Sequence, residues 1–228
     1  MHRTIAITGL VLLGAASGCA YDYNPTTFPS QHDLYDEPET YDSFVVRAQR
    51  NVYSAKIDPR FALGPDIRIS RYTDPDDSAV RGTAWGRPVS IDVRGSSARG
   101  VIGAVPFVIA ARRDKGVLRA VGSIAYRNSD FTLSGDVLSG TIGKCHYQLR
   151  RYDEAEARKQ IIALFDYDEN DLDDRPAPGT TPDRSVEYLG ERGCDGPGEP
   201  MSVRIPPELA EWGDAGAATA LALLLDAG

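Results

Sequence analysis

The strongest constraint on the fold is a regular alternation of apolar and polar residues between Trp85 and Arg151. Val89–Arg94 and Leu118–Tyr126 alternate residue by residue, and Val105–Ala111 is a continuous apolar run that we expect to be buried. Polar turns, most of which contain glycine, separate such runs at about 8–12-residue spacing, which is typical of antiparallel strands. We therefore predict a mainly β fold, in which an antiparallel meander forms a sandwich, barrel or curved sheet.

The same reasoning extends the sheet on both sides of this region. Further strands are expected at Ser43–Ser54, Ile67–Tyr72, Leu138–Arg150, Val186–Tyr188 and Met201–Ile205. One helix is inserted, at 153–164, because strong helix formers follow Asp153, a residue suited to the N-cap.

A short glycine pattern occurs twice in the meander. Gly100-Val101-Ile102-Gly103 and Gly140-Thr141-Ile142-Gly143 share the order G-x-I-G. The recurrence is either a weak internal repeat of two or three strands, or a set of glycines at bulges and close backbone approaches. We favour the second interpretation.

A second helix is predicted at 206–226, since Pro206-Pro207 suits a first helical turn. It contains an apolar run, Ala215–Leu225, which at 1.5 Å per residue rises about 17 Å and is too short to cross a bilayer. The run either docks on an open face or end of the sheet, or binds a partner protein. Docking is the default, because an exposed leucine run promotes aggregation.

The first nineteen residues have the order of a secretory signal peptide. A basic start at Arg3 precedes an apolar stretch up to Ala16, and small residues lead to Cys19. Ala16-Ser17-Gly18-Cys19 resembles the lipobox of bacterial lipoproteins, although leucine is commoner than Ala16 at the first position. The resemblance implies a signal peptide at 1–18, an acylated Cys19 as the first mature residue, and a lipid anchor in the membrane. The alternative is an ordinary cleaved signal in which Cys19 is incidental.

The resemblance also bears on location. Ala20 is not the Asp that retains such lipoproteins in the inner membrane of enterobacteria, so we expect a cell-envelope protein anchored in the outer membrane, facing the periplasm or the cell surface. Residues 19–43 are acidic, contain no Lys or Arg and offer no aliphatic run to bury, which predicts a flexible tether. Its four tyrosines are either a partner motif or ordinary linker content. Residues 44–228 then form a single domain.

Cys145 and Cys194 remain for the exported domain, and an even number of cysteines there predicts a disulfide. A Cys–His nucleophile is the alternative, because His146 adjoins Cys145. On a strand, however, neighbouring side chains project to opposite faces, which would keep the two apart.

Other candidate chemistry is sparse, and we predict no catalytic residue, no metal site and no cofactor. The opening of a calcium-binding loop is matched by Asp166, Asp168 and Asn170. Such a loop has Gly at its sixth position and Glu at its twelfth, where this chain has Asp171 and Ala177. A plain solvated loop is therefore favoured. A further pattern places four residues at every second position: Tyr188, Gly190, Arg192 and Cys194. They form either an Arg/Tyr patch for an anionic ligand or a strand that enters the disulfide.

The net charge of -8 argues against a nucleic-acid partner. The expected function is therefore a membrane-anchored, non-enzymatic binding or structural module, with another envelope protein as the candidate partner. The alternative is a carrier of a small apolar or lipid-like ligand in a β-barrel or cup. An enzyme that uses His146 beside an acid is the third option.

Overall fold

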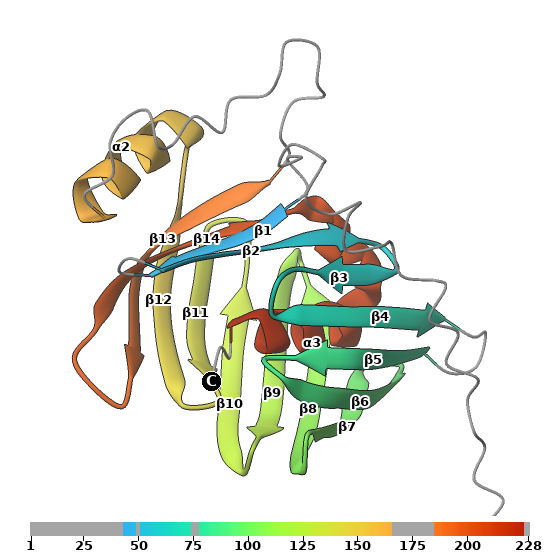
Figure 1. The fold of residues 1–228 in the computed structure, drawn as a ribbon. Helices are drawn as coiled ribbons and strands as arrows, with labels where there is room; N and C mark the ends of the chain where they lie inside the picture. The colour runs from blue at the N-terminus through green and yellow to red at the C-terminus, as the bar shows by residue number, and fades with distance from the viewer. Residues whose placement is uncertain (1–42, 49–50, 74–77, 166–184, 226–228) are drawn as a thin grey trace, which may run out of the picture. The chain divides into compact units, whose positions relative to one another are not determined.

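The computed structural model describes residues 43–48, 51–73, 78–165 and 185–225, all within one compact unit. Fourteen strands form a closed antiparallel barrel (Figure 1). The strands are β1 (Ser43–Ala48), β2 (Asn51–Asp58), β3 (Phe61–Leu63), β4 (Ile67–Thr73), β5 (Ser78–Ala84), β6 (Arg87–Arg94), β7 (Ser97–Ile102), β8 (Val105–Asp114), β9 (Val117–Ile124), β10 (Arg127–Leu133), β11 (Val137–Ile142), β12 (Cys145–Tyr152), β13 (Val186–Cys194) and β14 (Glu199–Ile205).

The barrel confirms the predicted meander, because every strand pairs with its neighbours in sequence and β1 closes the ring against β14. At the closure Val46 lies opposite Val203, and both side chains belong to the interior core. Closure removes the free sheet edges that would otherwise pair with other chains. Among the three predicted architectures, the structure is thus the barrel.

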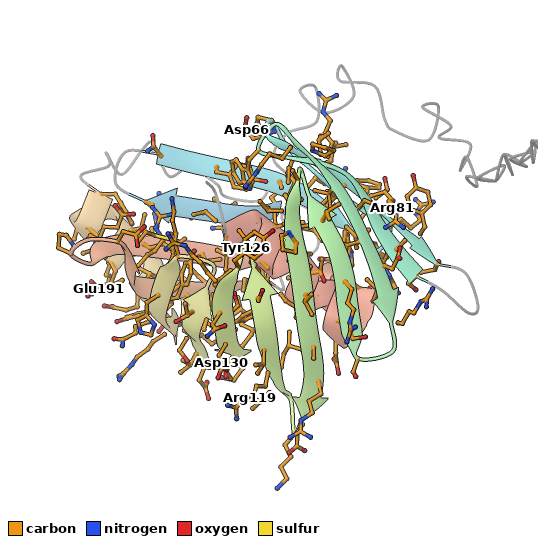
Figure 2. The ribbon with its side chains drawn as sticks, turned by 90° about the horizontal axis from the view of Figure 1, so that it is seen from below. Asp66, Arg81, Arg119, Tyr126, Asp130 and Glu191 are labelled. Carbon is orange, nitrogen blue, oxygen red and sulfur yellow. A yellow bond between two sulfur atoms is a disulfide. The ribbon has the colours of Figure 1, made fainter. Side chains whose placement is uncertain are left out.

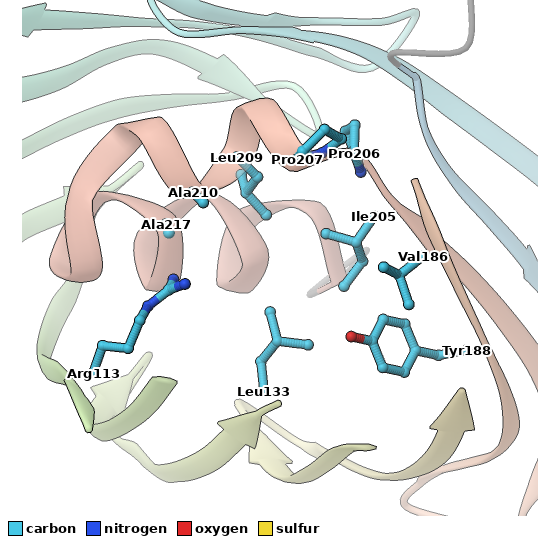
Figure 3. A pocket seen from close by; sticks show the side chains of 10 residues that line it. All are labelled: Arg113, Leu133, Val186, Tyr188, Ile205, Pro206, Pro207, Leu209, Ala210 and Ala217. Carbon is cyan, nitrogen blue, oxygen red and sulfur yellow. The ribbon is translucent and has the colours of Figure 1, made fainter. Parts of the chain in front are cut away.

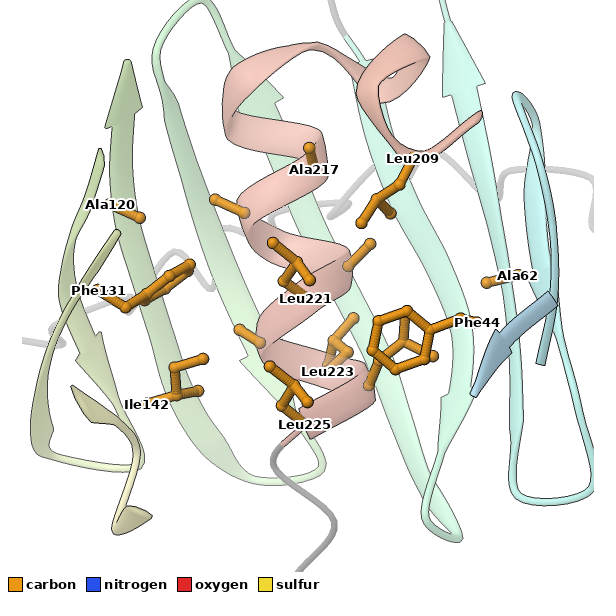
Figure 4. Close-up of a cluster of buried hydrophobic side chains, with 14 of the residues drawn as sticks. Phe44, Ala62, Ala120, Phe131, Ile142, Leu209, Ala217, Leu221, Leu223 and Leu225 are labelled. Atoms are coloured by element: carbon orange, nitrogen blue, oxygen red, sulfur yellow. The ribbon is translucent and has the colours of Figure 1, made fainter. Parts of the chain in front are cut away.

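The C-terminal segment fills the barrel (Figure 4). It consists of a 3-10 turn, η2 (Pro207–Trp212), and a helix, α3 (Gly213–Leu225), in which every residue from Ala215 to Leu225 is buried. A helix that is apolar on all sides is stable only when it is surrounded. Here β5–β9 pack against it from one side of the barrel. Docking was predicted correctly, but the helix predicted at 206–226 is divided at Gly213 into η2 and α3. In addition, α3 lies inside the closed barrel and not on an open face or end of a sheet.

Polar groups at both ends of α3 bind to the barrel wall. The carbonyls of Leu223 and Leu225 accept hydrogen bonds from Trp85 Nε1 at 2.8 Å and the Tyr147 hydroxyl at 2.9 Å. At the other end, the Asp214 carboxylate accepts one from the Arg113 backbone N–H at 2.7 Å. The first two bonds satisfy carbonyls at the C-terminal end of α3, which have no partner within the helix, whereas the Asp214 bond lies at the exposed end of the barrel. In the part of the chain that the structure describes, no helix is long and apolar enough to cross a membrane.

Five glycines let the paired strands approach closely. Each lies on an odd-numbered strand, and a Cβ there would come within 1.9–2.2 Å of a carbonyl oxygen on the preceding strand. The five are Gly82, Gly100, Gly122, Gly140 and Gly190. Gly100 and Gly140 begin the two G-x-I-G patterns, so the close-approach interpretation is confirmed for both. The glycines that end the two patterns, Gly103 and Gly143, have φ values of 62° and 57°. They lie in the turns between β7 and β8 and between β11 and β12, where a positive φ favours glycine.

The inserted helix α2 (Glu154–Phe165) is confirmed, and the Asp153 carboxylate caps it by accepting a hydrogen bond from the Glu156 N–H at 2.9 Å. Three strand predictions were wrong. Ser43–Ser54 is not one strand but covers β1 and the first part of β2, which pair antiparallel with each other. Leu138–Arg150 is not one strand but the hairpin β11–β12, because Gly143 turns the chain. Ser97–Ile102, which was assigned to no strand, is β7, since Ser97 pairs with Ala110 and continues the sheet beyond its turn.

Candidate docking surface

The cysteines form the predicted disulfide. Cys145 on β12 lies directly opposite Cys194 on β13, with a Cα–Cα distance of 4.2 Å. Cys145 is buried, whereas His146 is exposed on the opposite face of the strand. The alternation expected for a strand therefore separates His146 from the sulfur.

The other predicted site residues do not come together. Tyr188 belongs to the interior core, and its hydroxyl donates a hydrogen bond to the Ser134 carbonyl at 2.6 Å. Arg192 is paired with Glu199 on the adjacent strand, so Tyr188 and Arg192 form no open anion site. The calcium-loop candidates Asp166, Asp168 and Asn170, and Cys19 with its tether, lie outside the described residues. Within the described ranges, no group of three or more His, Cys, Asp or Glu side chains could hold a metal ion.

An apolar pocket of about 140 Å³ lies at the barrel end where α3 begins (Figure 3). Leu133, Val186, Ile205 and Leu209 line it, with Arg113 at its border. Its size is comparable to that of an engineered cavity of about 150 Å³ that binds benzene. The pocket has room for a small ring or a short aliphatic group, but a lipid-sized ligand would have to displace α3.

Tyr188 borders this pocket and gives a pH-dependent prediction. Burial, with a smaller contribution from Asp136, raises its pKa to about 12, although Arg151 opposes the shift. Since the ordinary tyrosine pKa is about 10, the hydroxyl stabilises the fold fully below about pH 10 and this contribution is lost between about pH 10 and 12. Urea unfolding at pH 9 and pH 11 should therefore show a smaller alkaline loss of stability in Tyr188→Phe than in the wild type. Equal losses would contradict the assignment.

Exposed apolar side chains gather on the outer face of β7, β8 and β9. Val101, Val108 and Val121 are 41%, 39% and 48% exposed, one on each strand. Ala110 lies opposite Val121 and is exposed as well. Contiguous apolar surface on the outside of a folded domain often marks an interaction site.

Arginines surround these valines. Arg99 lies opposite Val108, and Arg112 lies opposite Arg119 across β8 and β9. Within the part of the chain described, Arg99 and Arg112 form no ion pair, and Arg119 reaches Asp130 at 3.6 Å on the outer side of the barrel (Figure 2). We call this set the β7–β9 face: Arg99, Val101, Val108, Ala110, Arg112, Arg119 and Val121.

The charge of this region opposes that of the whole chain. Strands β5 to β9 with their turns, residues 78–124, contain eight basic and two acidic residues, a formal charge of +6 in a chain of -8. Seven of the eight are arginines. A shallow hollow of about 260 Å³ lies on the β7–β9 face, bordered by Arg112, Arg119 and Val121.

Sequence reasoning missed this face because it treated Val105–Ala111 as a buried run. That interpretation was wrong for every second residue: Phe107 and Ile109 are buried, whereas Val108 and Ala110 face solvent. The signal was present, since a strand with one buried face should carry polar residues at its outward positions. Valine at the outward positions of three consecutive strands is the exception that marks the surface.

Comparison with family models, with curated proteins and with solved structures gives no match for this chain.

Proposed function

We propose that this protein is a non-enzymatic lipoprotein of the cell envelope, anchored in the outer membrane through an acylated Cys19, whose barrel presents the β7–β9 face to another envelope protein. The observation that carries the proposal is the set of exposed valines on three adjacent strands. An apolar centre with an arginine-rich border is the usual anatomy of protein–protein interfaces, in which arginine is enriched and lysine depleted.

The packing of the interior also favours an external site. Because α3 fills the barrel, the apolar side chains available to a large partner are those on the outside. A closed barrel with a helical core is a rigid support, and rigid surfaces lose little conformational entropy when they bind. The lipobox resemblance supplies the anchor in this proposal, and the acidic segment 19–43 supplies the distance between anchor and barrel.

The proposed docking is tested by photo-crosslinking in intact cells. A photoreactive amino acid at Val108 should form one defined adduct with an envelope protein, because Val108 lies at the centre of the face. The same residue at Val52, which is 56% exposed on β2, is the matched control and should form none. Absence of an adduct at Val108, or equal adducts at both positions, would contradict the proposal.

The proposed anchor is tested by the intact mass of detergent-extracted protein. The expected mass begins at Cys19 and includes acyl chains, and the variant Cys19→Ser should leave the membrane fraction. A mature chain that begins elsewhere would remove the anchor from the proposal without affecting the docking face.

A second candidate function, transport of a small apolar ligand, is favoured by the pocket at the barrel end. If this function is correct, mass spectrometry of the native extract should detect a benzene-sized or short aliphatic molecule. The Leu133→Trp variant, whose larger side chain would occupy the pocket, should no longer contain this molecule. An extract without such a molecule would leave docking as the better explanation.

A further inference from the structure

We infer that the partner surface bound by the β7–β9 face is acidic, and that Arg112 and Arg119 together bind one of its carboxylates. This inference rests on the proposed function and specifies the chemistry of the partner. It follows in three steps from the placement of the two arginines, the surroundings of the pair, and the composition of the face.

The first step is that Arg112 and Arg119 form a cross-strand pair of like charge. They lie directly opposite each other on β8 and β9, and both side chains are exposed. Like charges at directly opposed positions destabilise an antiparallel pair. Local arrangements that oppose stability are expected at functional sites, where a bound ligand compensates them.

The second step is that the charge of this pair is incompletely neutralised. Arg119 is 3.6 Å from Asp130, but both side chains are more than half exposed, so the ion pair is weak. Arg81 gives a contrast on the same barrel, since it binds both the Asp92 carboxylate and the Ile91 carbonyl. Two guanidinium groups beside a shallow hollow are suited to a carboxylate, which arginine binds with two parallel hydrogen bonds.

The third step decides between kinds of anionic partner. Val108 and Val121 project from the interior of β8 and β9, and Val101 from the last part of β7, so none lies on a loop tip. They would not penetrate a bilayer without laying the sheet face on it. The surrounding cations are arginines almost throughout, as in the rest of the chain, and the planar guanidinium suits a side-chain carboxylate. The outward pattern, with apolar and basic side chains on neighbouring strands, complements a surface that presents aliphatic and acidic side chains together. An acidic protein is therefore favoured over a membrane.

The test measures binding of two fluorescent heptapeptides to the whole detergent-extracted protein by anisotropy. One peptide alternates glutamate with valine and the other alternates lysine with valine. We expect the acidic peptide to bind, more weakly as salt is added, and the basic peptide not to bind. The double variant Arg112→Glu/Arg119→Glu should bind the acidic peptide at least about tenfold more weakly.

The matched control is Arg60→Glu/Arg68→Glu, which makes the same change in net charge at exposed positions near β3 and β4. It should bind as the wild type does. Equal weakening by the control would show a non-specific charge effect and overturn the inference, as would binding of the basic peptide. Displacement of the acidic peptide by phosphatidylglycerol added to the micelles would assign the face to a lipid surface and overturn it too.

The photo-crosslink separates this inference from the proposed function. If the Val108 adduct persists in Arg112→Glu/Arg119→Glu, the face docks a partner without the carboxylate contact, and only the inference fails. If wild-type Val108 forms no adduct, the proposed function fails.

Discussion

Replacing Leu221 with Asp should abolish folding. Leu221 is fully buried on α3 at the centre of the barrel, and the described core around it consists of apolar side chains. Burying an unpaired carboxylate there costs several kcal/mol, in addition to the lost packing of a leucine, which alone is worth about 2–5 kcal/mol. A domain of ordinary stability, about 5–15 kcal/mol, has little reserve against both. The measurement is the yield of soluble protein and its thermal unfolding by circular dichroism.

Leu164→Asp is the matched control, since Leu164 is 44% exposed on α2 outside the barrel. It should change the melting temperature little. The milder variant Leu221→Ala should fold with a lower melting temperature, which gives a graded readout if Leu221→Asp cannot be recovered. A stable Leu221→Asp would mean that α3 is not needed inside the barrel.

Replacing Gly100 with Ala should have the next largest effect. The added Cβ would lie 2.0 Å from the Ser90 carbonyl oxygen and 2.6 Å from the Ile91 Cα, which are backbone atoms of the paired strand β6. Rotation of a side chain cannot relieve this contact, so the two strands must separate. We expect a loss of about 3 kcal/mol, which for a chain of this size lowers the melting temperature by roughly 6–12 °C.

Gly135→Ala is the control for this prediction, because a Cβ at Gly135 meets no atom within 4 Å. It should unfold at the wild-type temperature or slightly above, since alanine restricts the unfolded chain more than glycine does. Equal melting temperatures for Gly100→Ala and Gly135→Ala would show that the close approach of β6 and β7 is not required.

The docking face shows where reasoning from the sequence reached its limit. Val105–Ala111 was predicted to be buried as one continuous run, which is correct for Phe107 and Ile109 but not for the outward-facing Val108 and Ala110. Val101, Val108 and Val121 are diagonal neighbours only because of the register of three strands, and register is decided by turns and by burial of the opposite face. The like-charged pair Arg112 and Arg119 became visible only once that register was known.

The local features of this protein could be predicted from the amino-acid sequence. Period-two alternation predicted the strands of the meander, Asp153 predicted the start of α2, and strand alternation separated His146 from the Cys145–Cys194 disulfide. These features depend on neighbouring residues, and their physical causes act over a few positions of the chain.

The tertiary structure decided what depends on distant residues. An apolar run such as Ala215–Leu225 must be buried, but its composition does not say where, and closure of β1 on β14 provides the interior that α3 occupies. In the same way, alternation shows that a side chain points outward, whereas only strand pairing decides which outward side chains become neighbours. The helix inside the barrel and the surface outside it therefore have one cause: burial is a property of the assembled sheet and not of its separate segments.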